Sequence, residues 1–189
     1  IIFPDLKTNT IINGEPKEPI PPEYSGGIGE IGVKNIKEFV QKGGTLITLN
    51  SAADFPLKQF SLTIENSVEK ADRKSFFVPG SLLKVLIDTT HPIAYGYERE
   101  GAVFFRRSPV LAAKEGKSIV AYPPHNPLLS GWVNGEDYFY NKSALVDVPL
   151  GDGKIIIIGF SVLYRGQSHS TFKLLFNSIY YGPASLGEL

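Results

Sequence analysis

Two residues of this chain could form a nucleophile and base pair. Ser51 follows residues 45–49, an apolar run typical of a buried strand. In hydrolases, a sharp strand-to-helix turn exposes a nucleophile at such a place, beside backbone N–H groups that stabilise an oxyanion. His169 precedes the last predicted helix. If strand 154–160 runs parallel to strand 45–49, Ser51 and His169 lie at the same edge of the sheet. The alternative is a capping serine and a surface histidine, because the glycines of a G-x-S-x-G turn are absent.

A second polar group follows the last predicted strand. It consists of Tyr164, Arg165, Gln167 and His169. Ligands of α/β proteins bind at the carboxyl ends of the strands, so these side chains are candidate ligand-binding residues. The alternative is a hydrogen-bonded loop that holds the last helix.

Trp132 is the third candidate, because it lies in a stretch rich in aromatic residues. Such residues on a β-rich segment can stack on sugars or peptides, and they can equally form the core of a small sheet. The neighbouring aromatic residues are Tyr122, Tyr138, Phe139 and Tyr140.

The sequence gives little support for nucleotide or metal binding. Gly27, Gly29 and Gly32 form a literal GxGxxG, but a dinucleotide fingerprint needs a strand immediately before it, and the nearest one ends near Phe3. We therefore interpret the glycines as the entry to a helix. The chain has three histidines and none at the spacing of a known metal motif, so we predict no metal site.

Composition excludes further classes of function. The chain has 189 residues, with 19 Lys and Arg against 19 Asp and Glu, so nothing in its net charge favours nucleic acid. No apolar run approaches the length of a membrane span. Cysteine is absent, which removes disulfides and a thiol nucleophile. Methionine is also absent and the first residues resemble the end of a strand, so we expect a piece of a longer protein that lacks N-terminal strands.

Periodicity predicts the elements that position these residues. Residues 29–41 have helical spacing, Gly43 and Gly44 end that helix, and 45–49 form a strand, as in a βαβ unit with a parallel sheet. Residues 6–27 are rich in proline and glycine and predict a long loop. Residues 154–160 form a central strand in a hairpin with 144–148. Residues 171–180 form the last helix, with Phe172, Leu175, Phe176 and Ile179 on one face.

Several segments together resemble the C-terminal part of bacterial zinc carboxypeptidases of the carboxypeptidase A type. In that family, a class I glutamine-amidotransferase-like domain follows the metallopeptidase domain. The segments that carry the resemblance are Pro21-Pro-Glu-Tyr-Ser-Gly-Gly-Ile-Gly, Phe39-Val-Gln-Lys-Gly-Gly-Thr-Leu-Ile, Pro79-Gly-Ser-Leu-Leu, His91-Pro-Ile-Ala-Tyr-Gly, Pro127-Leu-Leu-Ser-Gly-Trp, Gly159-Phe, Arg165-Gly-Gln-Ser and Thr171-Phe-Lys-Leu-Leu-Phe-Asn.

The resemblance implies an accessory domain without zinc ligands of its own. Zinc, the catalytic residues and the natural partner of the domain would belong to the peptidase domain of the same parent chain, and the protein would be secreted or periplasmic. An amidotransferase needs a cysteine at the turn after the strand, where this chain has Asn50 and Ser51. Glutamine hydrolysis through a thioester is therefore excluded for this chain.

Taken together, the sequence predicts an α/β fold with a flavodoxin-like, mostly parallel sheet and helices on both faces. It predicts one amidotransferase-like domain over 1–189 with a β-rich insertion at 76–145. The predicted function is non-catalytic docking or ligand binding, to a peptide or glycan besides the peptidase domain, with no cofactor in this fragment. The alternatives are a serine hydrolase or amidase that uses Ser51 and His169, and a carbohydrate-binding module that uses Trp132.

Overall fold

A computed structural model describes residues 1–15 and 20–184 of the chain. Four α-helices and ten strands are assigned in this part. The helices are α1 (Thr8–Asn13), α2 (Gly29–Gln41), α3 (Asp54–Gln59) and α4 (His169–Tyr181). The strands are β1 (Ile2–Phe3), β2 (Thr45–Leu49), β3 (Ile64–Asn66), β4 (Ser81–Ile87), β5 (Glu100–Phe105), β6 (Leu111–Ala113), β7 (Lys117–Ala121), β8 (Leu128–Ser130), β9 (Ser143–Leu150) and β10 (Gly153–Ile158).

The parallel part of the sheet consists of β1, β2 and β10. β2 lies between the other two, with Ile2 opposite Ile47 on one side and Ile156 opposite Ile47 on the other. Four consecutive isoleucines, 155–158, are fully buried, as expected for a central strand that is covered on both faces. The predicted parallel pairing of 154–160 with 45–49 is therefore confirmed.

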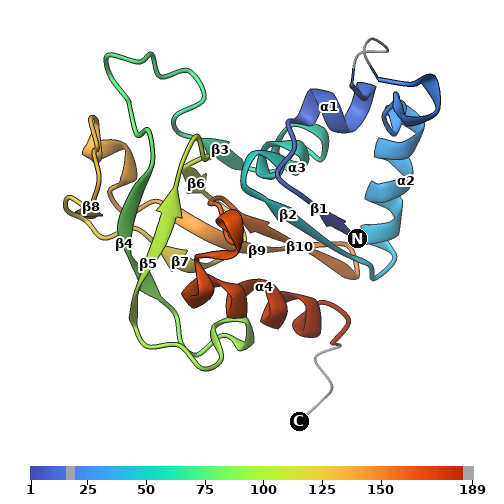
Figure 1. The fold of residues 1–189 in the computed structure, drawn as a ribbon. Helices are drawn as coiled ribbons and strands as arrows, with labels where there is room; N and C mark the ends of the chain where they lie inside the picture. Colours follow the sequence, from blue (N-terminus) through green and yellow to red (C-terminus); the bar gives the residue numbers. More distant parts are fainter. Residues whose placement is uncertain (16–19, 185–189) are drawn as a thin grey trace.

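The α/β fold class and its flavodoxin-like parallel part are confirmed, but the parallel part is smaller than expected. The strand order is β1-β2-β10-β9-β7-β4-β5, and every pairing from β10 to β5 is antiparallel. The reason is that the β-rich segment continues the same sheet through the β9–β10 hairpin instead of forming a separate one. Figure 1 shows these strands extending away from β2.

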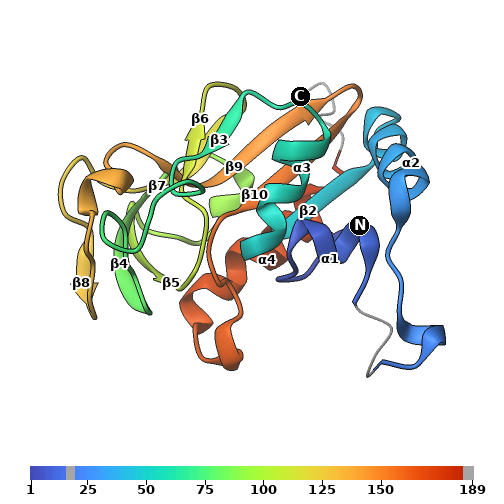
Figure 2. The ribbon, with the colours of Figure 1, turned by 90° about the horizontal axis from the view of Figure 1, so that it is seen from above.

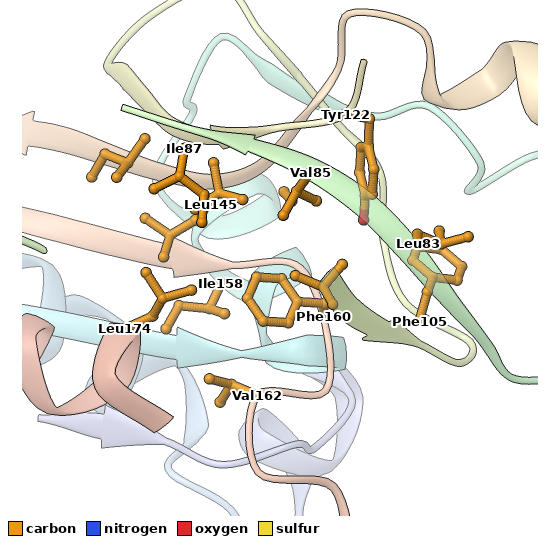
Figure 3. Packing of buried hydrophobic residues seen from close by; sticks show 14 of the residues in the cluster. Leu83, Val85, Ile87, Phe105, Tyr122, Leu145, Ile158, Phe160, Val162 and Leu174 are labelled. Atoms are coloured by element: carbon orange, nitrogen blue, oxygen red, sulfur yellow. The ribbon is translucent and has the colours of Figure 1, made fainter. Parts of the chain in front are cut away.

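Helices cover both faces of the sheet, as predicted. The side chains of α4 pack into one hydrophobic core with those of β4, β5 and β10, and residues of α2 and α3 pack into the other. Figure 1 shows α4 on the side of the sheet opposite to α1 and α3. In Figure 3, Leu174 of α4 lies beside Ile158 in the first of these cores. The alternating side chains of β10 thus join the two cores.

The last helix buries a different stripe from the predicted one. Thr171, Leu174, Leu175 and Ser178 are buried, whereas Phe176 is 53% exposed and Ile179 is also exposed. The buried stripe contains two small polar residues, so hydrophobicity alone did not identify it. Thr171 and Ser178 are accommodated because their hydroxyls donate to the Val162 and Leu174 carbonyls.

The loop predicted at residues 6–27 is in part helical. α1 lies within it, and its Ile11 is buried in the core beneath α2. Ile28 N–H donates to the Ile11 carbonyl, which joins α1 to the start of α2. The Pro16 to Pro19 stretch of the predicted loop lies outside the described residues.

Among the described residues, no helix combines the length and apolar character needed to cross a membrane.

Candidate functional site

The turn after β2 has the geometry of a nucleophile elbow, but its central residue is Asn50. β2 leads directly into a 3-10 turn, Asn50–Ala53, and then into α3. Asn50 is buried and has a φ of 50°, in the left-handed region that asparagine tolerates better than most residues. Strained strand-to-helix turns of this kind carry the nucleophile of α/β hydrolases. The elbow residue is thus an amide one position before Ser51, and an amide is not a nucleophile.

The carboxylate of Asp5 accepts hydrogen bonds from this elbow. Asp5 follows β1, which is paired with β2, so the ends of the two strands lie together. Asn50 Nδ2 donates to Asp5 Oδ2 at 2.8 Å, and Ser51 N–H donates to Asp5 Oδ1 at 3.1 Å. In elbow enzymes, the N–H of the residue after the nucleophile stabilises the oxyanion. Here the Asp5 carboxylate already accepts the hydrogen bond from that N–H group.

A cavity of about 500 Å³ opens beside the elbow. Its lining comes from residues that follow β1, β2 and β5 and from the loop after β3, and it includes Ser51. Figure 2 shows α1 and α3 beside β2 in this part of the molecule. Ligand sites of open α/β sheets lie outside the carboxyl ends of parallel strands, as this cavity does. The lining residues are Lys7, Thr8, Asn9, Ser51, Asp54, Lys58, Asn66, Val68, Phe76, Arg107, Ser108 and Pro109.

The cavity has three cationic side chains, and two of them lack an acidic partner. Lys58 Nζ lies 2.7 Å from Glu69 Oε1, and this hydrogen bond raises the pKa of Lys58. Within the described ranges, Lys7 and Arg107 form no ion pair. Asp54 is the acidic residue of the lining; burial raises its pKa, and Lys58 opposes that shift. The cavity therefore suits a ligand that carries a negative group.

The structure does not bring Ser51 and His169 together. No histidine lines the cavity of Ser51. His169 Nε2 lies 2.8 Å from the Gly166 carbonyl oxygen, and its ring packs on Phe172 with 5.2 Å between ring centroids. His169 thus belongs to the turn before α4, and no described contact makes it a base for Ser51.

The remaining residues of the predicted polar group make separate contacts in the structure. Tyr164 packs on Phe104 of β5 at a centroid distance of 4.4 Å, and the Arg165 guanidinium lies 5.4 Å from the Tyr164 ring. Gln167 is exposed. None of these residues lines a described cavity. Tyr164 therefore has a packing contact where the sequence suggested a ligand contact.

Trp132 is 63% exposed and follows the short strand β8. Its backbone is fixed by Ser81, whose Oγ donates to the Trp132 carbonyl at 2.7 Å and accepts from the Trp132 N–H at 3.0 Å. The neighbouring rings of Tyr122 and Phe139 are buried in the core. The aromatic stretch is thus divided between a core and an exposed tryptophan.

A buried histidine and aspartate pair was missed by the sequence reasoning. His91 Nε2 lies 3.4 Å from Asp147 Oδ2, and both side chains are almost fully buried. His91 Nδ1 accepts the Ile93 N–H, so a neutral ring carries its proton on Nε2 and donates it to Asp147. Burial lowers the pKa of His91, and the Asp147 carboxylate opposes that shift. An acidic residue inside the apolar run of β9 was the signal in the sequence.

No protein-family profile matches the sequence, and no curated protein does. Solved structures do match. The cytoplasmic proteins STM3548 and STM1381 from Salmonella typhimurium align over 96% of this chain, at 13% and 15% identity. Their TM-scores are 0.56 and 0.57, and the alignments cover 70% and 71% of the two Salmonella chains. The β-galactosidase from Bacillus circulans sp. alkalophilus matches 80% of this chain at 16% identity and a TM-score of 0.52, with 21% of its own chain covered.

What these neighbours share with the chain is the flavodoxin-like, amidotransferase-like α/β fold. The resemblance to a zinc carboxypeptidase domain is wrong, because the structures named above are other proteins of this fold and are not such domains. One of the segments that suggested it, residues 39–47, is the end of α2 and the start of β2, so it reflects the helix–strand arrangement of the fold. The zinc peptidase partner and the secreted or periplasmic location rested on that resemblance alone.

Proposed function

We propose that this chain is a non-catalytic domain of the amidotransferase-like fold that binds a small polar anion in the cavity beside Asn50. The non-catalytic part of the proposal rests on the pair of hydrogen bonds from the elbow to Asp5, and the anion-binding part rests on Lys7 and Arg107 in the cavity. A carboxylate in that position repels a developing oxyanion and competes for the donor that would stabilise it. The elbow therefore serves structure and binding, and not transition-state stabilisation.

The lining of the cavity supports an anionic ligand. Among the described residues, Lys7 and Arg107 form no ion pair, and an arginine can hold a carboxylate or phosphate through two parallel hydrogen bonds. Thr8 Oγ1 is buried and has no hydrogen-bond partner among the described residues. A bound ligand or water would satisfy such a group.

The comparisons support a role as one part of a larger protein. In the β-galactosidase from Bacillus circulans sp. alkalophilus, the matching part is about one fifth of the chain. The same fold can therefore be an addition to a larger enzyme, although this likeness concerns the fold alone.

A binding experiment tests the proposal. Thermal shift and calorimetry with acetate, citrate, inorganic phosphate and a sugar phosphate are expected to show millimolar or tighter binding of at least one anion. Arg107→Gln should weaken that binding by about tenfold or more, since a charge-assisted pair is lost. Arg99→Gln is the matched control, because Arg99 is an exposed arginine that lines none of the described cavities.

Two results would contradict the proposal. One is the absence of binding by every anion. The other is hydrolysis of a generic ester or amide that Ser51→Ala abolishes, which would establish the serine hydrolase that the sequence left open.

A further inference from the structure

A second cavity, of about 660 Å³, lies on the other side of the sheet. It is formed by the loop after β4 and the C-terminal half of α4, which lie against each other in Figure 1. It shares no lining residue with the cavity beside Asn50. Its lining residues are Thr89, Thr90, His91, Pro92, Tyr95, Asn177, Tyr180, Tyr181 and Ala184.

The wall of this second cavity is held in place by hydrogen bonds. Asn177 Nδ2 donates to the carbonyls of Ile93 and Tyr95, at 2.9 and 3.0 Å, and so fixes the loop on α4. His91 accepts the Ile93 N–H within the same loop. Because the loop is already ordered, a ligand would lose little binding free energy to ordering it.

The lining has no charged side chain, and its surface is mostly apolar, with hydroxyls from two threonines and three tyrosines. None of the nine residues is an acid, a lysine or an arginine, and burial keeps His91 neutral near pH 7 by lowering its pKa. Tyr95 and Tyr180 are each 80% exposed, so two large rings face solvent at this place. Both N–H groups of Asn177 Nδ2 already donate to carbonyls of the chain, so its Oδ1 remains available as an acceptor.

A buried carboxylate lies behind this wall. Asp147 contacts His91 at 3.4 Å, and its Oδ1 is buried with no hydrogen-bond partner among the described residues. Burial, together with the nearby Asp147 carboxylate, raises the pKa of Tyr181 to about 12, so its hydroxyl keeps its proton.

We infer that this cavity binds a saccharide. Exposed tyrosine rings can stack on the C–H face of a pyranose, while the threonine, tyrosine and asparagine groups exchange hydrogen bonds with its hydroxyls. The absence of charge in the lining favours a neutral sugar over an anion, a nucleotide or a charged peptide. The cavity opens to solvent beside two exposed tyrosines, so either a free sugar or the end of a glycan chain has the required chemistry.

Saturation-transfer NMR on the whole chain tests this inference. The probes are D-glucose, D-galactose, lactose and xylotetraose at about 10 mM, a concentration that detects dissociation constants in the millimolar range. We expect at least one of them to bind. A tetrasaccharide that binds better than the monosaccharides would identify a glycan chain, and equal affinities would identify a free sugar.

Variants locate the site. Tyr95→Ala and Tyr180→Ala should each weaken sugar binding by about tenfold, because a stacking surface is lost. Tyr24→Ala is the control: that tyrosine is 78% exposed and lines no described cavity. Circular dichroism should report an unchanged fold for all three, since these side chains are exposed.

Three outcomes would overturn the inference: no binding of any sugar, sugar binding that survives both tyrosine variants, and loss of sugar binding in Trp132→Ala instead. Binding of phenol or indole with no binding of sugars would also reject it, since the cavity would then be an aromatic site. None of these outcomes bears on the anion site, whose lining is separate.

Discussion

At the scale of single residues, two carboxylates define the chemistry of this protein. Asp5 accepts hydrogen bonds from the elbow after β2, and Asp147 of β9 pairs with His91 in the loop after β4. Asp5 accepts a hydrogen bond from the Ser51 N–H, which is the oxyanion donor in elbow enzymes. Asp147 contacts the imidazole of His91, which could otherwise act as a base. Both interactions are consistent with the binding function proposed above.

Replacing the elbow residue tests the role of Asp5. Asn50→Cys places a thiol at the position of the nucleophile in elbow enzymes. The chain has no other cysteine, so all thiol alkylation would report on this position. The Asp5 carboxylate should raise the pKa of that thiol and slow its alkylation by iodoacetamide, as followed by mass spectrometry. Adding Asp5→Asn should accelerate the reaction by about tenfold, as expected for a shift of one pKa unit. Equal rates in the single and double variants would show that Asp5 does not act on the elbow.

Titration of His91 should make the protein less stable in mild acid. The folded state has a lowered pKa at His91, so between pH 6.5 and that lower pKa the unfolded chain binds the proton first. The free energy of unfolding should therefore be highest above pH 6.5 and fall as the pH decreases. Urea denaturation between pH 7.5 and about 5 measures this. His91→Gln should reduce the slope in this range, and an unchanged slope in that variant would show that another group causes the pH dependence.

At the scale of elements, α4 shows how packing selects one face of a helix. Its sequence offers two apolar stripes, and the stripe with Leu174 and Leu175 faces the sheet while Phe176 remains exposed. The hydroxyls of Thr171 and Ser178 fit the buried side because both donate to carbonyls. Shape and hydrogen bonding, more than hydrophobicity, thus oriented this helix.

Alanine substitutions distinguish the two stripes. Leu174→Ala should lower the free energy of unfolding by about 2–5 kcal/mol, because it leaves a cavity in a close-packed core. Phe176→Ala should change it by about 1 kcal/mol or less. Chemical denaturation of both variants measures the difference, and a larger loss for Phe176→Ala would reverse the assignment of the buried face.

At the scale of the whole molecule, one sheet joins the parallel strands to the β-rich segment. β10 connects them, since it pairs parallel with β2 and antiparallel with β9, and its side chains alternate between the two cores. The two parts of the chain are therefore expected to unfold together.

A charge in β10 tests this cooperativity. Ile157 is fully buried, so Ile157→Asp places an unpaired carboxylate in the core at a cost of several kcal/mol and should unfold the whole chain in one transition. Ile31→Asp, on the exposed face of α2, is the control and should stay folded. Loss of the parallel part alone, with the near-ultraviolet signal of Tyr122 and Phe139 retained, would mean that the parts are independent.

The sequence alone determined the elements with strong local signals. β2, α2 and β10 are where periodicity predicted them, because an apolar run of β-branched residues and a helical stripe ended by Gly43 and Gly44 are local properties. The absence of cysteine and the neutral net charge also limited the chemistry before any fold was known.

Tertiary structure alone decided the site. Asp5 and Asn50 are 45 residues apart in the chain, and His91 meets Asp147 only because the loop after β4 folds over β9. Asn50 rather than Ser51 is the elbow residue because of one backbone angle that no spacing rule reports. Ser51 and His169 follow strands at the same edge of the sheet, but His169 contacts Gly166 and Phe172 instead of Ser51. Side-chain contacts, which spacing in the sequence does not report, therefore decide which residues can react together.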